Sequence, residues 1–204
     1  MVAKKTKVTK FHYKSNEHGI ELHKMCKAQN EWVLKMAKGR SERNLMYNVK
    51  YHLAFPRFKG GNNAVLVHLE YVGKDKNKTR PRAVFHASSA VDDSDSPFAR
   101  VGGGSRRKYA LIPSKPMFKP IRTNRNRDIN HGHFRENDTE YKLLEKVSQY
   151  IDDKDEHSLI RMYTDLEPCL SCDYVIIQFT KRYPNINIEV YYKDEYKPKG
   201  EGLI

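Results

Sequence analysis

The sequence predicts an α/β fold in which helices cover a mixed β-sheet. Two β-rich runs, AVLVHLEYV at 64–72 and AVFHASSAV at 83–91, flank the polar segment GKDKNKTRPR and predict an antiparallel hairpin. Residues 138–192 then alternate helix, strand, helix and strand, and a helical crossover of that length joins parallel strands. The 204 residues include 13 Tyr, 8 Phe and 1 Trp, which is enough aromatic surface to build a core.

The N-terminal 60 residues are predicted to form a basic arm and a helix, and residues 61–204 a separate domain. Residues 1–15 show no clear periodicity. Residues 16–40 contain no proline and predict a helix with Gly39 as its C-cap. A long loop is expected at about 91–137, where DDSDS, VGGGSRRK and four prolines follow one another.

The C-terminal elements follow from spacing. Residues 138–151 place apolar side chains on one helix face, and 168–183 form a helix that opens at Pro168 and stops before Pro184. The short apolar run 158–164 and the alternating run 186–192 predict strands.

The formal net charge of +13 is unevenly distributed. Residues 1–60 hold 14 Lys and Arg but 4 Asp and Glu, and Arg100 to Arg127 hold nine basic residues and no acidic one. Such basic stretches with interleaved aromatics are typical of nucleic-acid binding, although a solvated loop would carry the same charge.

Several classes of protein are excluded. No apolar run reaches the roughly 18–20 residues needed to span a bilayer, so no membrane partner is expected. The basic start MVAKKTKVTK leads into no apolar segment of a secretory signal. Cys26, Cys169 and Cys172 are too few for a disulfide framework.

Two helix starts carry reactive side chains. Pro168-Cys169-Leu170-Ser171-Cys172 places two thiols one turn apart, where the helix dipole favours thiolate. A zinc ribbon, a redox pair or simply buried cysteines would each explain them. Asp138-Thr139-Glu140 is either a helix cap or, combined with the cysteines, a three-ligand zinc site with an acid–base carboxylate.

The motif H/C-x-E followed by P-C-x-x-C identifies the zinc-dependent cytidine deaminase superfamily, which Asp138-Thr139-Glu140 and Pro168–Cys172 resemble. The text DTEYKLLEKV, IRMYTDLEPCLSCDYVIIQF and YPNINIEVYY is most similar to deaminase domains of bacterial polymorphic toxins. The resemblance implies a three-layer fold with about five strands, Zn²⁺ bound by Cys169 and Cys172, and Glu140 as the proton carrier. Asp138 stands where the family has His or Cys, with His131 or His133 as the alternative ligand.

The expected activity is hydrolytic deamination of cytosine to uracil in a nucleic acid, with DNA favoured. A water activated at the zinc would attack C4, and Glu140 would carry its proton to N3 and the departing ammonia. The residues expected to contact the base are Phe85, His86, Phe118, His133, Phe134 and Pro168; those expected to contact phosphates are Arg106, Arg107, Lys108, Arg122, Arg125 and Arg127.

Two other functions stay open: deamination of a free nucleoside or nucleotide, and nucleic-acid binding around a structural zinc without catalysis. Adenine is also possible as the target base, because the same zinc pocket accepts either base. A toxin origin implies a soluble domain, secreted or delivered into the cytoplasm of a target cell, and an immunity protein as a partner. Otherwise the protein would be cytoplasmic.

Overall fold

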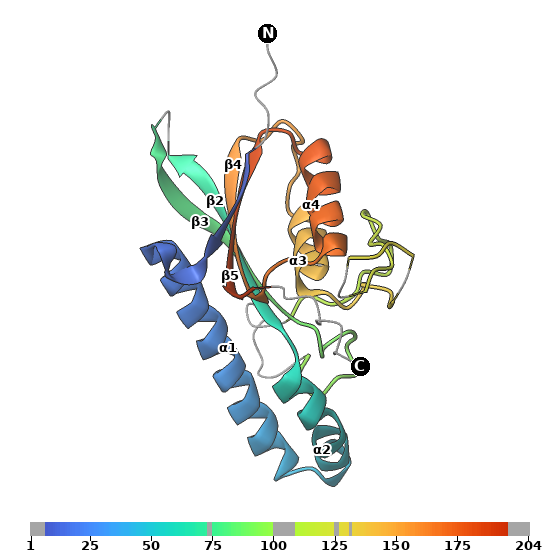
Figure 1. Ribbon diagram of the computed structural model, residues 1–204. Coiled ribbons are helices and arrows are strands. Elements are labelled where there is room, and N and C mark those ends of the chain that lie inside the picture. Colours follow the sequence, from blue (N-terminus) through green and yellow to red (C-terminus); the bar gives the residue numbers. More distant parts are fainter. Residues whose placement is uncertain (1–6, 73–74, 100–108, 125–126, 131, 196–204) are drawn as a thin grey trace.

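The computed structural model describes residues 7–72, 75–99, 109–124, 127–130 and 132–195. Its central element is a five-stranded mixed sheet in the order β1-β5-β4-β2-β3 (Figure 1). The strands are β1 (Val8–His12), β2 (Asn63–Val72), β3 (Asp75–Ser88), β4 (Ser158–Leu166) and β5 (Ile186–Asp194). The α-helices are α1 (Glu17–Ser41), α2 (Leu45–Gly60), α3 (Thr139–Ser148) and α4 (Leu170–Arg182), and a short 3-10 helix, η1 (Tyr13–Ser15), precedes α1.

The pairing confirms the α/β prediction. Strands β2 and β3 form the expected antiparallel hairpin. Strands β4 and β5, which α4 connects, pair with each other in parallel. Antiparallel pairing of β2 with β4 makes the sheet mixed. The hairpin is longer than predicted, because β3 begins at Asp75 within the segment expected to be a turn.

Three N-terminal elements differ from the sequence interpretation. Residues 8–12, expected to be part of an arm, form the edge strand β1, which pairs in parallel with β5. The first helix runs past Gly39 to Ser41, so Gly39 is not its C-cap. A second helix, α2, was not predicted. It contains Pro56 and leaves Leu45 and Leu53 strongly exposed.

The two faces of the sheet are covered by different helices (Figure 1). Helices α3 and α4 pack on one face, over a core that includes Leu66, Ile160 and Ile188. Helix α1 packs on the other face. There Leu22 and Cys26 belong to a second core, formed with the residues of β2, β4 and β5 that point away from α3 and α4. Successive strand residues point to opposite faces, so one sheet fills both cores and completes three layers.

The segment from 89 to 137 contains no helix or strand among its described residues, apart from isolated bridges, in agreement with the predicted loop. Its first part packs against α1 and α2, where Val91 and Phe98 meet Val33 and Phe58. Its later part lies beside α3 and α4 (Figure 1).

Candidate metal and acid–base site

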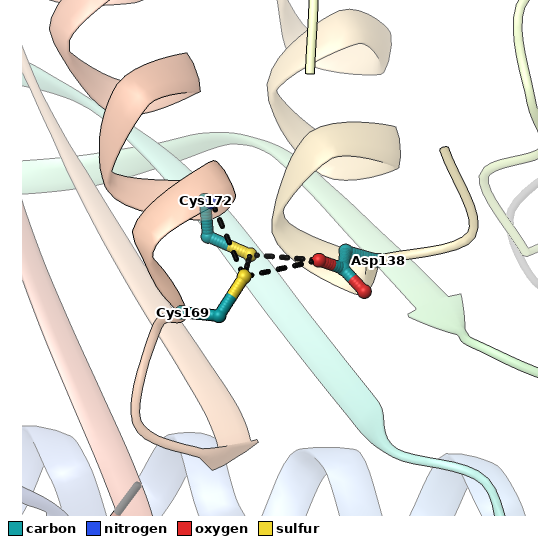
Figure 2. Close-up of side chains that lie close together, drawn as sticks. All are labelled: Asp138, Cys169 and Cys172. Carbon is teal, nitrogen blue, oxygen red and sulfur yellow. Dashed lines mark hydrogen bonds between the residues drawn. The ribbon is translucent and has the colours of Figure 1, made fainter. Parts of the chain in front are cut away.

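Asp138 occupies the N-cap position of α3, but within the described residues its side chain makes no capping hydrogen bond. Its Oδ2 atom instead lies 3.2 Å from the Sγ atom of Cys169 and 3.3 Å from that of Cys172 (Figure 2). The geometry therefore favours the metal-ligand interpretation of this aspartate over the helix-cap interpretation.

The two cysteines come from the first turn of α4. Cys169 is the N-cap residue, its Sγ accepts a hydrogen bond from the backbone N–H of Cys172 at 3.4 Å, and the two sulfur atoms are 3.2 Å apart (Figure 2). Pro168, which is buried, fixes the approach to this turn. The third cysteine, Cys26, lies on α1 at the opposite face of the sheet.

This donor set fits a zinc ion. The three candidate ligand atoms lie within 4.8 Å of one another. Tetrahedral zinc, with bonds of about 2.0–2.3 Å, holds its donors about 3.3–3.8 Å apart, so the atoms need to separate by only a few tenths of an ångström. The Cys169 thiol, burial and the Asp138 and Glu140 carboxylates raise the pKa of the Cys172 thiol well above its usual range. A divalent cation would stabilise these acidic groups as anions.

Glu140 is the second residue of α3 and is buried. Its Oε1 accepts a hydrogen bond from the Thr164 hydroxyl at 3.2 Å, and its Oε2 one from the Thr139 hydroxyl at 2.9 Å. Burial, together with the charge of Asp138, raises the pKa of Glu140 to about 7. A carboxyl group fixed at both oxygens and poised near neutrality is suited to proton transfer.

Arg135 lies behind the aspartate. Its Nη1 atom is 3.8 Å from Oδ1 of Asp138, the oxygen that does not face the thiols. A cation on that side orients the carboxylate, as polar partners behind metal ligands commonly do.

The family model "Toxin-deaminase: The BURPS668_1122 family of deaminases" matches residues 57–194, more than half of the chain. This chain belongs to that deaminase family. The family is a deaminase domain of the cytidine deaminase-like superfamily found in toxins, which confirms the resemblance drawn from the motifs. No curated protein was found to match the chain.

The residues expected to contact the base are scattered. Phe134 and His133 are exposed in the loop that leads to Asp138. Phe85 is half-buried at the opposite end of α3, where its ring meets Tyr150. His86 is buried on the α1 face, next to Tyr109.

Phe118, also expected to contact the base, is buried. It is 2% exposed and packs against Phe179 of α4 in the core, so its position does not support a role in holding a base. A basic loop sequence gives no indication that one of its aromatic residues is buried between helices.

Of the residues expected to contact phosphates, Arg122 and Arg127 are exposed, in the segment that leads to α3. The remaining members of that set lie outside the described residues: Arg106, Arg107, Lys108 and Arg125.

Three buried polar side chains on α3 and α4 were not singled out from the sequence. Lys142 is 0% exposed, and its Nζ donates hydrogen bonds to the carbonyl oxygens of Ser88 and Val91 and to Asp92. Glu145 and Ser171 accept backbone hydrogen bonds from the 117–121 segment. The sequence could have indicated these contacts, because it places a lysine and a glutamate on the apolar face of a predicted helix, and such residues are buried only when they are paired.

A cavity of about 340 Å³ lies away from this site, on the α1 side of the sheet. Phe11, Tyr71 and Arg161 are among the residues that line it. Among the described residues, none of the helices combines the length and apolar character that crossing a membrane requires.

Proposed function

We propose that the chain is a zinc-dependent deaminase that converts cytosine to uracil in a nucleic acid, with DNA as the favoured polymer. The observation that carries this proposal is the Asp138–Cys169–Cys172 cluster with the buried Glu140 carboxyl group beside it on the same helix. Family membership supports the reaction class, because it makes the chain a deaminase.

Asp138, Cys169 and Cys172 would hold the zinc ion. The chemistry supplied by a zinc ion bound there is activation of a water molecule towards the amino-bearing carbon of the base. The positive ends of the α3 and α4 dipoles favour the anionic form of ligands placed at their first turns.

Glu140 is assigned the proton transfers. Thr164 and Thr139 hold its two carboxylate oxygens, so the group has a fixed direction without being bound as a ligand. The carboxylate would accept the two protons of the attacking water in turn and deliver one to ring N3 and one to the departing amino group, so that cytosine and water give uracil and ammonia.

The surface charge favours a polymeric substrate over a free nucleoside. Residues 1–60 hold 14 Lys and Arg against 4 Asp and Glu, and the stretch from Arg100 to Arg127 holds nine basic residues and no acidic one; a free nucleoside needs neither. Residues 61–204 are proposed to carry the catalytic site, on a sheet that β1 and α1 of the basic residues 1–60 complete. Delivery as a toxin into a target-cell cytoplasm and neutralisation by an immunity protein complete the proposal.

The decisive experiment is Glu140→Ala, assayed by sequencing oligonucleotides after incubation. Deamination should fall by about 100- to 10,000-fold, while zinc stays near one per chain and oligonucleotide binding is retained. The exposed Glu136→Ala is the matched control and should keep full activity. Undiminished deamination by Glu140→Ala would show that the assignment is wrong.

The wild-type protein separates the competing functions. Rapid turnover of free cytidine with none of oligonucleotides would favour the nucleoside deaminase, and zinc-loaded protein that binds DNA but deaminates nothing would favour a binding domain. Assays with adenine-containing strands decide the target base.

A further inference from the structure

The loop that leads into α3 is organised around Thr123. Its backbone bridges both Ile129 and His133 in antiparallel fashion, and the amide of Asn130 donates to the Arg122 carbonyl at 3.0 Å. Gly132 has φ +85°, and a Cβ atom there would come 2.6 Å from the Thr123 carbonyl oxygen, so the turn depends on glycine. The loop is therefore a small folded unit that brings residues 122 and 134 together.

This unit is attached to the metal site from both directions. The amide of Ile121 donates to Ser171 Oγ at 3.0 Å, and Ser171 lies between the two cysteines in the sequence. At its other end, Phe134 precedes Asp138 by four residues, and Arg135 contacts the Asp138 carboxylate. Residues 122 and 134 consequently lie at the border of the site.

The incoming 117–121 segment is fixed firmly. Glu145 of α3 accepts hydrogen bonds from the amides of Met117 and Phe118 at 2.8 and 2.6 Å. Gln178 of α4 exchanges two hydrogen bonds with the backbone of Lys119. Both zinc-site helices thus hold the segment whose next residues form the loop unit.

An exposed aromatic–cation pair lies on this unit. Phe134 is 58% exposed, and the guanidinium carbon of Arg122 lies 5.1 Å from its ring centroid. Exposure of a large apolar ring to water is unfavourable. A ring held in place by an arginine, however, provides a flat surface on which a base can stack. Arg127, also exposed, is a second cation of the same loop, where its amide donates to the Asn124 carbonyl at 3.2 Å.

We propose that Phe134 and Arg122 form a stacking platform for an unpaired base next to the target base, and that the substrate is therefore a single strand. The inference rests on the proposed function. In a duplex both faces of each internal base are covered by its neighbours, so a flanking base could reach the ring only after unstacking. Arg122 also offers its guanidinium to the adjacent phosphate.

The first test measures activity. Phe134→Ala should lower kcat/KM for a single-stranded cytosine-containing oligonucleotide about 5- to 150-fold, mainly through KM, because stacking on one ring is being removed. The rate with free cytidine should not change, and Phe134→Trp should restore the oligonucleotide rate. A matched drop with free cytidine, or no drop at all, would overturn the platform.

Tyr150→Ala is the matched control. Tyr150 is also exposed and also carries a cation, the Lys146 Nζ at 5.3 Å, but it lies at the C-terminal end of α3, away from the metal cluster. Its removal should leave KM unchanged. If Tyr150→Ala lowered kcat/KM for the oligonucleotide as much as Phe134→Ala does, any exposed aromatic residue would have this effect, and the proposal would be overturned.

A second test does not require deamination. Binding of fluorescent oligo-dT and oligo-U is measured by anisotropy with Glu140→Ala protein, with and without Phe134→Ala. The Phe134 change should weaken binding of at least one strand about 5- to 150-fold, and the strand with the larger loss identifies the polymer. Duplex DNA should bind more weakly than the single strand and respond little.

The outcomes separate the two proposals. Selective weakening of single-strand binding in a protein that deaminates nothing would retain the platform and remove the proposed function. Deamination that proceeds equally on duplex DNA, or oligo-dT and oligo-U binding that ignores Phe134, would remove the platform and leave the deaminase.

Discussion

Both faces of the sheet have an apolar core, but they differ in the polar side chains that lie beside it. On the α3 and α4 face, buried polar groups such as Glu140, Lys142 and Ser171 all bond to other segments or lie at the metal cluster. On the α1 face, apolar packing such as that of Leu22 and Tyr191 is accompanied by polar contacts remote from that cluster, such as those of the Tyr163 hydroxyl with His23 and Asp165. The difference indicates that reactive groups are concentrated on one face, while the other stabilises the sheet.

The largest effect is expected at the Asp138–Cys169–Cys172 cluster. Asp138→Ala should reduce zinc from near one per chain to near zero and lower deamination about a thousandfold or more, because one of three protein ligands is lost. Zinc content by elemental analysis and activity on oligonucleotides measure this. Cys26→Ala, on the opposite face, is the control and should keep its zinc.

Zinc retained with normal affinity in Asp138→Ala would transfer the ligand role to a histidine. The described candidate is His133, and His131→Ala should be assayed beside His133→Ala. Either result would also weaken the contrast between the faces, since the exposed loop would then contribute a ligand.

The next largest effect is expected at Lys142. Its charge is fully buried and bonded to Asp92, which also pairs with Arg57 of α2 at 2.5 Å. Lys142→Ala should lower the free energy of unfolding by about 3–5 kcal/mol, because it leaves Asp92 and two carbonyl groups without their buried partner. Urea denaturation measures the loss, and the partly exposed Lys146→Ala should stay within about 0.5 kcal/mol of wild type.

A small change in Lys142→Ala would contradict the role given to this lysine. Lys142→Met keeps much of the volume without the charge and is expected to fall between alanine and wild type. Because Lys142 and Arg57 share one carboxylate, this test also measures how strongly the N-terminal helices are coupled to α3.

A smaller effect, dependent on pH, is expected on the α1 face. Burial lowers the pKa of His86 from 6.5 to about 4, so the unfolded chain binds a proton that the folded protein excludes. The free energy of unfolding should therefore keep its full value above pH 6.5 and decrease by about 2–3 kcal/mol as the pH falls towards 4. His86→Gln should flatten this decline, as measured by thermal unfolding at several pH values.

The exposed His18→Gln is the control for His86 and should keep the wild-type decline. Activity of His86→Gln at pH 7 should equal that of wild type, since His86 lies away from the metal cluster. Loss of activity at unchanged stability would instead return His86 to the base-contacting set in which the sequence placed it.

The predictable part of the fold is the part set by local spacing. Apolar periodicity and the positions of Pro168 and Pro184 defined α3, β4, α4 and β5 to within a few residues. Strand β1 was missed because VTKFH is short, basic and only partly buried, and its partner lies 180 residues away. Helix α2 was missed because Pro56 and its exposed leucines disturb the amphipathic pattern.

For the site, the sequence predicted which residues gather but not what fixes them. Asp138, Cys169 and Cys172 were identified by motif, and their helices bring them together. The contacts of Lys142 and Glu145 depend on loop segments remote in sequence, and no short-range rule assigns partners at such separations. The burial of Phe118 was not predicted for the same reason.

The pairing of β1 with β5 has a consequence for the order of folding. Val8 lies opposite Ile188, so the first strand of the chain cannot pair until the last one is in place. Strands β2 and β3 are adjacent in the sequence and can pair early. Pairing of β1 with β5 closes a very long loop, which is entropically costly and therefore late. Until then the edge of β5 is open to other chains, and β1 is the segment that closes it.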